Sequence, residues 1–398
     1  MVERWPIVIV GGGPAGTATA LFLVRRRPEL ASEILILDKA IHPRFKVCAG
    51  GLIPHTIACL EELGIALEIP HVPVSRAFAL TPAGTVEHNE RRGFCTVVRR
   101  DCFDALLVDS CMRRGVTVRQ GEKVLDVVEH AEFVEVKTER QNYRASVVVG
   151  ADGSGSLVRR RVFGHDDRTI GRAIMADVSA LDLHWAFPND PWCKFDFRPA
   201  AEGLRGYAWM FPCSIDGTPH WNVGVYSSQA KAQGCRMNGL LEKALSRIGA
   251  RAVRSCAYPV RLFHSRTRLA TSRVLLVGDA AGVDPLMGEG ISFAFEYGRL
   301  AAECIAAWRE PGSDGVAAYE RMVRESWLGR KLRRLNMLER MFYGRTSKFW
   351  FWFAVSSERA RRVGLRWYSG QDGWDQLSLP RGLARLGQEA ISLMRGLL

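Results

Sequence analysis

The chain has 398 residues, of which 47% are hydrophobic and 24% are charged. This length and composition are ordinary for a globular protein and suffice for two closely joined domains. No run of about 18 apolar residues occurs, which excludes a helix crossing a membrane. The ten cysteines form no CxxC pair and the nine histidines form no HxxxH pair. We therefore expect no metal site and, since the first strand pattern already begins at Pro6, a cytoplasmic protein without a signal peptide.

The excess positive charge is concentrated near the C-terminus. The net charge is +13, and the residues from Arg321 onward include 16 Lys or Arg against 6 Asp or Glu. Five of the 11 tryptophans lie in the same part: Trp327, Trp350, Trp352, Trp367 and Trp374. A basic and aromatic composition suits a membrane surface or a partner. No nucleic-acid motif accompanies it, so we expect no nucleic-acid binding.

The N-terminal part of the chain predicts a βαβ unit. The apolar run Ile7–Val10 is typical of a buried strand, and GGGPAG and the helical pattern ATATALFLVRRR follow it. A second apolar run, Ile34–Leu37, ends on Asp38. This order of elements indicates a Rossmann-like arrangement with a parallel sheet.

The nucleotide-binding pattern is interrupted and returns near residue 274. Further strands are predicted at 95–98, 124–128, 133–136, 146–149 and 274–277, with a helix after the first that ends at Gly115. Residues 168–261 read as strands and loops with one helix near 237–248, and the chain is helical from about residue 318. The predicted fold class is therefore α/β: a Rossmann-like domain interrupted by an inserted β-rich domain, with a C-terminal helical segment.

Gly11, Gly13 and Gly16 form a GxGxxG motif at the first strand-to-helix junction. Glycines there permit a tight turn and a close approach to a pyrophosphate, whose charge the helix N-terminus favours. Asp38 is placed to bind an adenosine ribose hydroxyl. The motif alone is weak evidence, but its position between a strand and a helix strengthens the prediction of a dinucleotide site.

The segment 274–291, VLLVGDAAGVDPLMGEGI, predicts the other end of that site. Its strand ends at Gly278-Asp279, and a glycine-bearing loop leads into an apolar helix. Such a loop presents a carboxylate and free backbone N–H groups. A flavin dinucleotide suits these groups, with ribityl hydroxyls near Asp279 and the isoalloxazine ring near Gly290 and Ile291.

The segment 44–52, RFKVCAGGL, carries the most reactive side chains. Arg44 and Lys46 near a flavin could stabilise its reduced anion, and Gly50 and Gly51 let the backbone pass close to the ring. Cys48 has three readings that remain open: a packed small hydrophobe, a thiol in contact with the flavin, or a proton donor.

Three further motifs are less specific. Asp152, in GADGS, lies either in an ordinary turn or in a second nucleotide-binding fingerprint. Arg100 either binds a phosphate or ring edge, or is a surface residue at a helix start. Tyr207, Trp209 and Phe211 share one face of a predicted strand, which is either a core face or an aromatic wall that holds an apolar substrate.

Together these motifs resemble the geranylgeranyl reductase family of FAD-dependent oxidoreductases, within a wider class that contains aromatic hydroxylases and flavin-dependent halogenases. The resemblance covers about residues 6–310 and rests on GGGPAG with Asp38, RFKVCAGGL, RxxFD at Arg100, GADGS, YAWMFP and GDAAG…P…GEGI, in this order. Three departures limit it. The family usually has Cys-Gly-Gly at Cys48–Gly50, and halogenases have WxWxIP where this chain has YAWMFP, which argues against halogenation. The basic, aromatic C-terminal segment matches no motif of the family.

The resemblance implies FAD as cofactor, with Tyr207, Trp209 and Phe211 lining a substrate pocket. The cofactor-binding residues expected are Gly11, Gly13, Ala15, Gly16, Asp38, Lys39, Arg44, Lys46, Cys48, Ala49, Gly50, Arg100, Val124, Asp152, Asp279, Gly290 and Ile291. The catalytic candidates are Cys48 and, for positioning or protonation, Tyr207. The expected domains are a discontinuous FAD-binding domain (1–75, 95–165 and 262–317), a substrate-binding β-rich domain (76–94 and 166–261) and a C-terminal helical segment (318–398).

The leading functional hypothesis is reduction of carbon–carbon double bonds in an apolar, isoprenoid-like substrate by reduced flavin. The chain has no second dinucleotide fold, so NAD(P)H would visit transiently or a reduced electron-transfer protein would supply electrons. The alternatives are a flavin monooxygenase that hydroxylates an aromatic or peptide-borne substrate, and a flavin-binding partner protein without turnover.

The aromatic run 349–355, flanked by basic residues, carries its own hypothesis. Residues 348–362 either make peripheral contact with the inner membrane face, from which a lipid substrate enters, or form a helical cap over the substrate domain that buries the aromatic rings.

Overall fold

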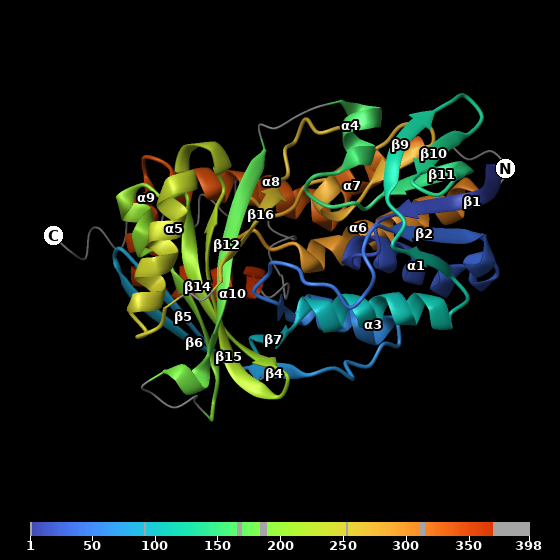
Figure 1. Cartoon of the computed structure of the whole chain (residues 1–398). Helices are drawn as coiled ribbons and strands as arrows, with labels where there is room; N and C mark the ends of the chain where they lie inside the picture. Colours follow the sequence, from blue (N-terminus) through green and yellow to red (C-terminus); the bar gives the residue numbers. More distant parts are fainter. Residues whose placement is uncertain are drawn as a thin grey trace.

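Two sheets lie side by side, each with its own helices, and a string of C-terminal helices runs along both (Figure 1). The computed structural model describes residues 2–90, 93–164, 169–183, 189–251, 254–309 and 315–368. The prediction for residues 369–398, Trp374 included, lies outside the described residues. In Figure 1 the β-rich sheet lies on the left and the N-terminal sheet on the right, and residues of both line the candidate site.

The first sheet is mainly parallel. Its order is β8 (Thr117–Gln120), β2 (Ile34–Asp38), β1 (Val2–Val10), β11 (Asn142–Gly150), β10 (Val134–Thr138) and β9 (Val124–Glu129), and β17 (Val274–Leu276) also pairs with β11. All pairs are parallel except those of β10 with β9 and β11. Ile7, Val8 and Ile9 are fully buried in the main core of the protein, which explains the continuous apolar run.

Helices α1 (Pro14–Arg26), α3 (Arg100–Arg113) and α6 (Ile291–Trp308) pack together against this sheet, and α4 (Leu157–Phe163) lies against β9. Gly298 lets α1 and α6 approach closely, since a Cβ there would lie 2.8 Å from the Thr19 nitrogen. The Rossmann-like prediction is confirmed. Short 3-10 helices lie at Pro28–Glu33 (η1), Ala180–Asp182 (η2), Arg198–Glu202 (η3), Gly278–Ala280 (η4) and Gly315–Ala317 (η5).

The second sheet is the β-rich part predicted from the sequence. Its order is β16 (Cys256–Arg261), β12 (Ile170–Ser179), β15 (Thr218–Ser227), β14 (Gly206–Ile215), β13 (Trp192–Asp196), β5 (Arg76–Thr81) and β6 (Gly84–Asn89). Helix α5 (Ala230–Ser246) covers one face. A small third sheet has the order β3 (Gly51–Leu52), β7 (Cys95–Val98) and β4 (His71–Val74). Helix α2 (Pro54–Glu62) follows β3 in the chain.

Several element boundaries differ from the prediction, and the largest differences are at the starts of β1 and α5. Strand β1 begins at Val2 rather than Ile7, because Val2–Trp5 pair with Asn142–Ala145 of β11 in spite of their polar side chains. Helix α5 begins at Ala230, seven residues before the predicted start. In both places hydrogen bonding extends an element beyond its apolar pattern.

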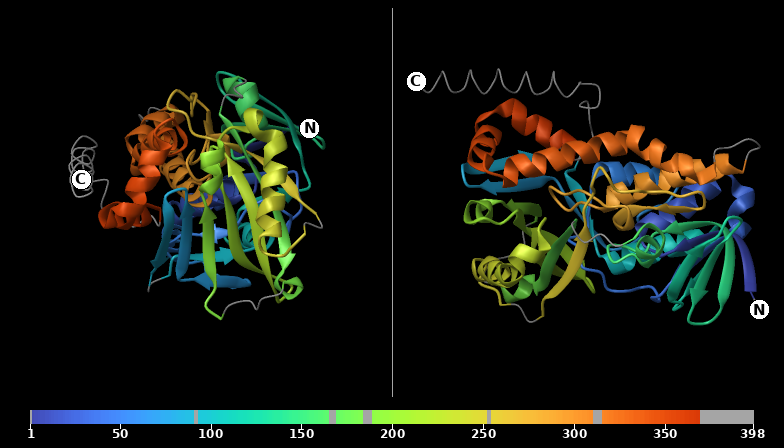
Figure 2. Two further views of the ribbon diagram at one scale, coloured as in Figure 1. Left: turned by 90° about the vertical axis from the view of Figure 1, so that its left-hand side faces the viewer. Right: turned by 90° about the horizontal axis from the view of Figure 1, so that it is seen from above.

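The C-terminal helices are α7 (Ala318–Glu325), α8 (Trp327–Tyr343), α9 (Ser347–Ser356) and α10 (Glu358–Tyr368). The apolar side of α7 and the start of α8 belong to the core of the first half, and α9 packs against β6 and η3 of the second (Figure 2). Phe351 and Phe353 are buried, which fits the hypothesis that this segment caps the second sheet. Among the described residues, no helix is both long and apolar enough to cross a bilayer.

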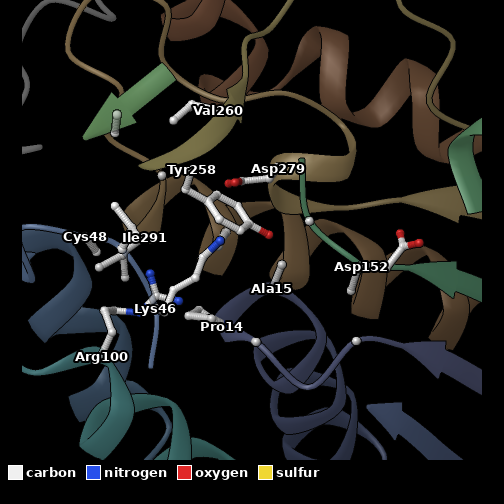
Figure 3. Close-up of a pocket in the computed structure, with 18 of the residues that line it drawn as sticks. Pro14, Ala15, Lys46, Cys48, Arg100, Asp152, Tyr258, Val260, Asp279 and Ile291 are labelled. Carbon is white, nitrogen blue, oxygen red and sulfur yellow. The ribbon is translucent and has the colours of Figure 1, made fainter. Parts of the chain in front are cut away.

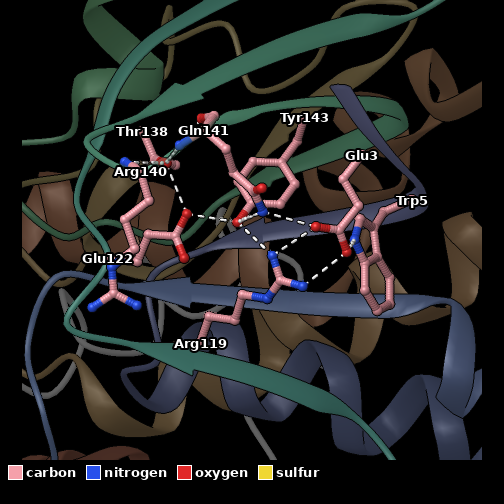
Figure 4. A network of polar contacts seen from close by, with 8 residues as sticks. All are labelled: Glu3, Trp5, Arg119, Glu122, Thr138, Arg140, Gln141 and Tyr143. Carbon is pink, nitrogen blue, oxygen red and sulfur yellow. Dashed lines mark hydrogen bonds and ion pairs between the residues drawn. The ribbon is translucent and has the colours of Figure 1, made fainter. Parts of the chain in front are cut away.

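A buried polar network joins the strands at the edge of the first sheet (Figure 4). The Glu122 carboxylate accepts hydrogen bonds from Tyr143 Oη (2.6 Å) and Thr138 Oγ1 (2.7 Å). Arg119 donates to Tyr143 Oη (2.7 Å) and forms an ion pair with Glu3 (2.8 Å). Because Glu122 is almost completely buried, these bonds fix the segment that carries Val124 to the candidate site.

Candidate functional site

A cavity of about 500 Å³ opens between the two sheets (Figure 3). Its wall contains the predicted substrate residues Tyr207, Trp209 and Phe211. It also contains the following predicted cofactor residues: Gly11, Gly13, Ala15, Asp38, Lys39, Arg44, Lys46, Cys48, Ala49, Gly50, Arg100, Val124, Asp152, Asp279, Gly290 and Ile291. Gly16 alone of the predicted set does not line the cavity. The fold therefore gathers segments that lie up to 280 residues apart in sequence.

The glycine loop at the start of α1 is shaped to accept a phosphate. A Cβ on Gly11, whose φ is +112°, would lie 2.3 Å from Ala151 O, and a Cβ on Gly16 would lie 2.0 Å from Gly11 O. Gly16 thus serves close packing of helix on strand rather than cofactor contact. A Cβ on Gly13 would meet nothing nearer than Arg44 Nη2 at 3.6 Å. Because α1 has neither a side-chain N-cap nor an acidic residue in its first turn, its N–H groups suit a pyrophosphate.

Asp38 holds this loop in place. Its Oδ2 accepts a hydrogen bond from Gly12 N (2.7 Å) and its Oδ1 accepts one from Ala40 N (2.8 Å). Each carboxylate oxygen retains a second lone pair, so the predicted bond to a ribose hydroxyl remains compatible with this geometry.

Two acids line the middle of the cavity. Asp152 Oδ2 accepts hydrogen bonds from Leu157 N (2.6 Å) and Val158 N (3.2 Å), whereas its buried Oδ1 has no hydrogen-bond partner among the described residues. Burial raises the pKa of Asp152. Asp279 Oδ2 accepts from Ser154 Oγ at 2.8 Å. A buried oxygen without a partner is unusual and suits a hydroxyl-bearing ligand, so these residues fit a dinucleotide.

Two arginines are fixed in the cavity wall by one buried acid. Arg100 donates to both carboxylate oxygens of Asp104 (2.8 and 2.9 Å), and Arg44 Nη2 lies 3.0 Å from Asp104 Oδ2. Asp104 is completely buried. Arg100 also interacts with the Cys48 thiol. The alternative that Arg100 is a surface residue is therefore wrong.

Lys46 extends across the cavity toward Tyr258 (Figure 3). Its Nζ lies 3.0 Å from the centroid of the Tyr258 ring, a cation–π contact. Burial lowers the pKa of Lys46 to about 8 in spite of the nearby Asp279, and the cations Arg100 and Arg44 lower it further. Lys46 thus supplies the positive charge expected beside a flavin, but its ammonium group loses its proton at a pH only slightly above neutral.

Cys48 lies half-buried at the turn into β3. Its Sγ accepts a hydrogen bond from Gly50 N at 3.3 Å. Gly50 has φ +79°, and a Cβ there would lie 1.9 Å from Val98 O, so this position requires glycine. Ala49 therefore replaces only the first glycine of the family's Cys-Gly-Gly, and Gly50, which makes the turn, is retained.

Tyr207, Trp209 and Phe211 form one wall of the cavity, and all three are buried. A Cβ on Gly51 would lie 3.0 Å from the Phe211 ring, so glycine allows the two segments to meet. Tyr207 Oη donates to Met287 O at 2.7 Å, and burial raises the pKa of its hydroxyl. The Tyr207 proton is thus already held by a backbone carbonyl, which favours positioning over protonation.

A second cavity of about 320 Å³ adjoins the first. Met287, Glu289 and Tyr368 line both cavities. Its lining is almost entirely apolar and comes from β5, β6, α8, α9 and α10, with Phe78, Phe197, Leu335, Phe342, Phe351 and Phe353 as the large side chains. Sequence analysis did not predict this cavity, because its walls meet only through tertiary packing.

Sequence analysis also missed residues in and beside the two cavities. Asp284 and Glu289 are acidic residues in the otherwise apolar loop between Asp279 and Ile291. Their position in that loop could have indicated a role in the site. Tyr258 and Lys331 belong to no motif, and only the fold brings them to the cavities.

One cluster among the described residues has metal-ligand geometry. The potential ligand atoms of His55, Cys59 and Glu296 lie within 4.8 Å of one another. Arg299 donates to Cys59 Sγ (3.4 Å) and Glu296 Oε1 (3.3 Å). Burial alone would lower the pKa of His55, but its hydrogen bonds with Cys59 and Glu296 raise it to about 10. Hydrogen bonds and ion pairs therefore join His55, Cys59, Glu296 and Arg299 in one cluster, with His55 Nε2 2.8 Å from Glu296 Oε1.

The comparison with known families agrees with this site. The family described as "FAD binding domain" matches residues 4–321. The chain belongs to this FAD-binding family. It is 29% identical to the chloroplastic geranylgeranyl diphosphate reductase of Oryza sativa (86% of this chain, 76% of the relative) and 27% identical to the menaquinone reductase of Mycobacterium tuberculosis (75% and 76%). The crystal structure of a geranylgeranyl bacteriochlorophyll reductase-like protein from Thermoplasma acidophilum has the same fold, with a TM-score of 0.74 and 18% identity over all of both chains.

Proposed function

We propose that this FAD-dependent oxidoreductase reduces carbon–carbon double bonds in a long apolar, isoprenoid-like substrate. The observation that carries the proposal is the apolar cavity whose wall is continuous with that of the flavin cavity through Met287 and Glu289. Both curated relatives described above are named as reductases, which supports the same reaction class.

FAD supplies the hydride chemistry when it is bound. The residues of the chain bind and orient it: the α1 N-terminus takes the pyrophosphate, and Asp279 takes the ribityl hydroxyls. Arg44, Lys46 and Arg100 provide positive charge where a reduced ring gains negative charge.

The apolar cavity holds the hydrocarbon part of the substrate and keeps water away from it. Burying an apolar chain there is favourable because phenylalanine, leucine and methionine side chains surround it. Tyr207 and Trp209 orient the end of the substrate that reaches the flavin cavity.

We propose NAD(P)H or a reduced electron-transfer protein as the electron donor. The parallel sheet described here provides one dinucleotide site, which suits transient contact by the donor.

Anaerobic reactions test the proposal. The purified holoprotein is reduced with NADPH, NADH or dithionite and then mixed with geranylgeranyl diphosphate or an unsaturated menaquinone. Reoxidation of the flavin with formation of a hydrogenated product supports the reductase. Reoxidation by oxygen alone with an oxygenated product would assign a monooxygenase instead, and a flavin that no donor reduces would indicate a binding protein without turnover.

A further inference from the structure

Ionisable side chains are buried in the loop that separates the two cavities and in the helix beside it. Asp284 is 3% exposed and Lys331 of α8 is 4% exposed, and both line the apolar cavity. Glu289 lies on the boundary of both cavities. Burying charged groups in an apolar wall is costly, and such groups in a cleft mark candidate functional sites.

The loop that carries Asp284 is clamped by three tyrosines. Tyr226 Oη donates to Pro285 O (2.9 Å), Tyr343 Oη to Leu286 O (3.0 Å) and Tyr207 Oη to Met287 O (2.7 Å). These tyrosines come from β15, α8 and β14. The loop is therefore held from three sides, and its carboxyl group is fixed at the cavity wall.

The surroundings of Asp284 favour its protonated form near neutral pH. Burial raises the pKa of Asp284 to about 7, against the lowering effect of the Leu286 and Met287 backbone N–H groups. Among the charged groups facing it, Glu289 raises this pKa and Lys331 lowers it. The other titratable groups that face it are Tyr207, Tyr226 and Tyr343.

The neighbouring groups are less suited to release a proton. Glu289 accepts hydrogen bonds from Ser292 N (2.9 Å) and Ser292 Oγ (2.6 Å), so its two oxygens are engaged at the start of α6. Tyr207 donates its proton to Met287 O. Asp284 accepts hydrogen bonds from backbone N–H groups of its own loop, with Leu286 N at 2.7 Å from Oδ1 and Met287 N as the second donor, and its side chain lines the apolar cavity.

We propose that Asp284 is the catalytic acid that protonates the substrate carbon in the apolar cavity. The inference rests on the proposed function. As the π bond of the alkene breaks, one carbon forms a C–H bond with the hydride supplied from reduced FAD, and its neighbour forms one with the Asp284 proton. The carboxylate then regains a proton from water, and NAD(P)H or an electron-transfer protein restores the two electrons.

Asp284→Asn tests the inference, because it keeps the shape of the side chain and removes the acid. We expect the kcat for hydrogenation of geranylgeranyl diphosphate to fall by about 100-fold or more, with little change in KM. Flavin content and the rate of flavin reduction by dithionite should be unchanged. The matched control is Asp196→Asn, which changes a buried acid of β13 that pairs with Arg198 and Arg247 and lines neither cavity, and which should keep kcat.

A readout without turnover completes the test. Infrared titration of the unreacted holoprotein should show a protonated carboxyl near neutral pH that is missing in Asp284→Asn. A variant that keeps wild-type kcat, or a wild type without this carboxyl signal, would overturn the role of Asp284 alone. A wild type that reduces no alkene would overturn the proposed function together with it.

Discussion

The hydroxyl of Tyr207 donates a 2.7 Å hydrogen bond to the backbone carbonyl of Met287, and this bond joins strand β14 of the second sheet to the loop between Asp279 and Ile291. Of the two roles predicted for Tyr207, positioning and protonation, this bond favours positioning. Its loss should loosen the loop without removing an acid.

Tyr207→Phe should therefore lower kcat by less than about 10-fold, well below the effect of losing a general acid. The free energy of unfolding should fall by about 1 kcal/mol, because the Met287 carbonyl loses its donor. Steady-state kinetics and urea denaturation check the two values. A loss of about 100-fold in kcat at unchanged stability would return Tyr207 to the role of proton donor.

The cofactor assignment predicts that Gly13→Val and Asp279→Ala lose FAD. The protein itself leaves room for a side chain at Gly13, so valine should fold normally and collide only with the pyrophosphate. Flavin content after purification, read from the visible spectrum beside circular dichroism, measures this. Gly239→Val in α5, where a Cβ meets nothing within 4 Å, is the matched control and should keep its flavin. Full flavin retention in both site variants would defeat the assignment.

Asp284 should make stability depend on pH in a defined direction. Its pKa is raised from 3.8 to about 7 on folding, so the folded protein binds this proton more tightly than the unfolded chain. The resulting stabilisation is complete below pH 3.8 and is lost as the pH rises through about 7. Relative to Asp284→Asn, the wild type should lose of the order of 4 kcal/mol between these limits. Denaturant unfolding across this range measures the difference, and a constant difference would contradict the prediction.

The network at the edge of the first sheet should also contribute to stability. Tyr143→Phe removes one donor from the buried Glu122 carboxylate and should lower the free energy of unfolding by about 1–3 kcal/mol. Urea denaturation of the apoprotein measures it, so that loss of cofactor does not contribute. Because Glu122 and Val124 line the cofactor cavity, FAD affinity should fall as well. Unchanged values of both would show that Thr138 alone satisfies Glu122.

Peripheral membrane contact through residues 348–362 remains a prediction. The buried Phe351 and Phe353 fit the cap hypothesis, while Lys348 and Arg359 are exposed beside them. If the contact exists, the protein should sediment with phosphatidylglycerol vesicles at low salt but not with phosphatidylcholine vesicles. Lys348→Glu with Arg359→Glu should abolish sedimentation, and Arg113→Glu, on exposed α3 surface, should not. If the wild type does not sediment with either kind of vesicle, only the hypothesis of a helical cap remains.

The sequence predicted the parts of the site that depend on local chemistry. Gly11, Asp38, Asp152 and Asp279 each stand at the end of a strand, where the apolar pattern and the residue type are both visible, and all four line the cavity. Cys48, Ala49 and Gly50 also line the cavity, and Gly50 has φ +79° there.

The parts that were missed depend on tertiary packing. In the sequence, Lys331 is one of many cations on a basic helix. It becomes buried in the wall of the apolar cavity only because α8 packs there. Tyr258 likewise stands in an ordinary strand, and its contact with Lys46 joins residues more than 200 positions apart. No local pattern could report either contact.

The wall that Met287 and Glu289 share between the two cavities has a thermodynamic consequence. A ligand that contacts Met287 and Glu289 from one cavity touches the same side chains that face the ligand in the other cavity. The affinities for flavin and for substrate must then be linked by one coupling free energy, and each ligand must change the affinity of the other by the same factor. We therefore expect flavin retention to depend on whether the apolar cavity is occupied.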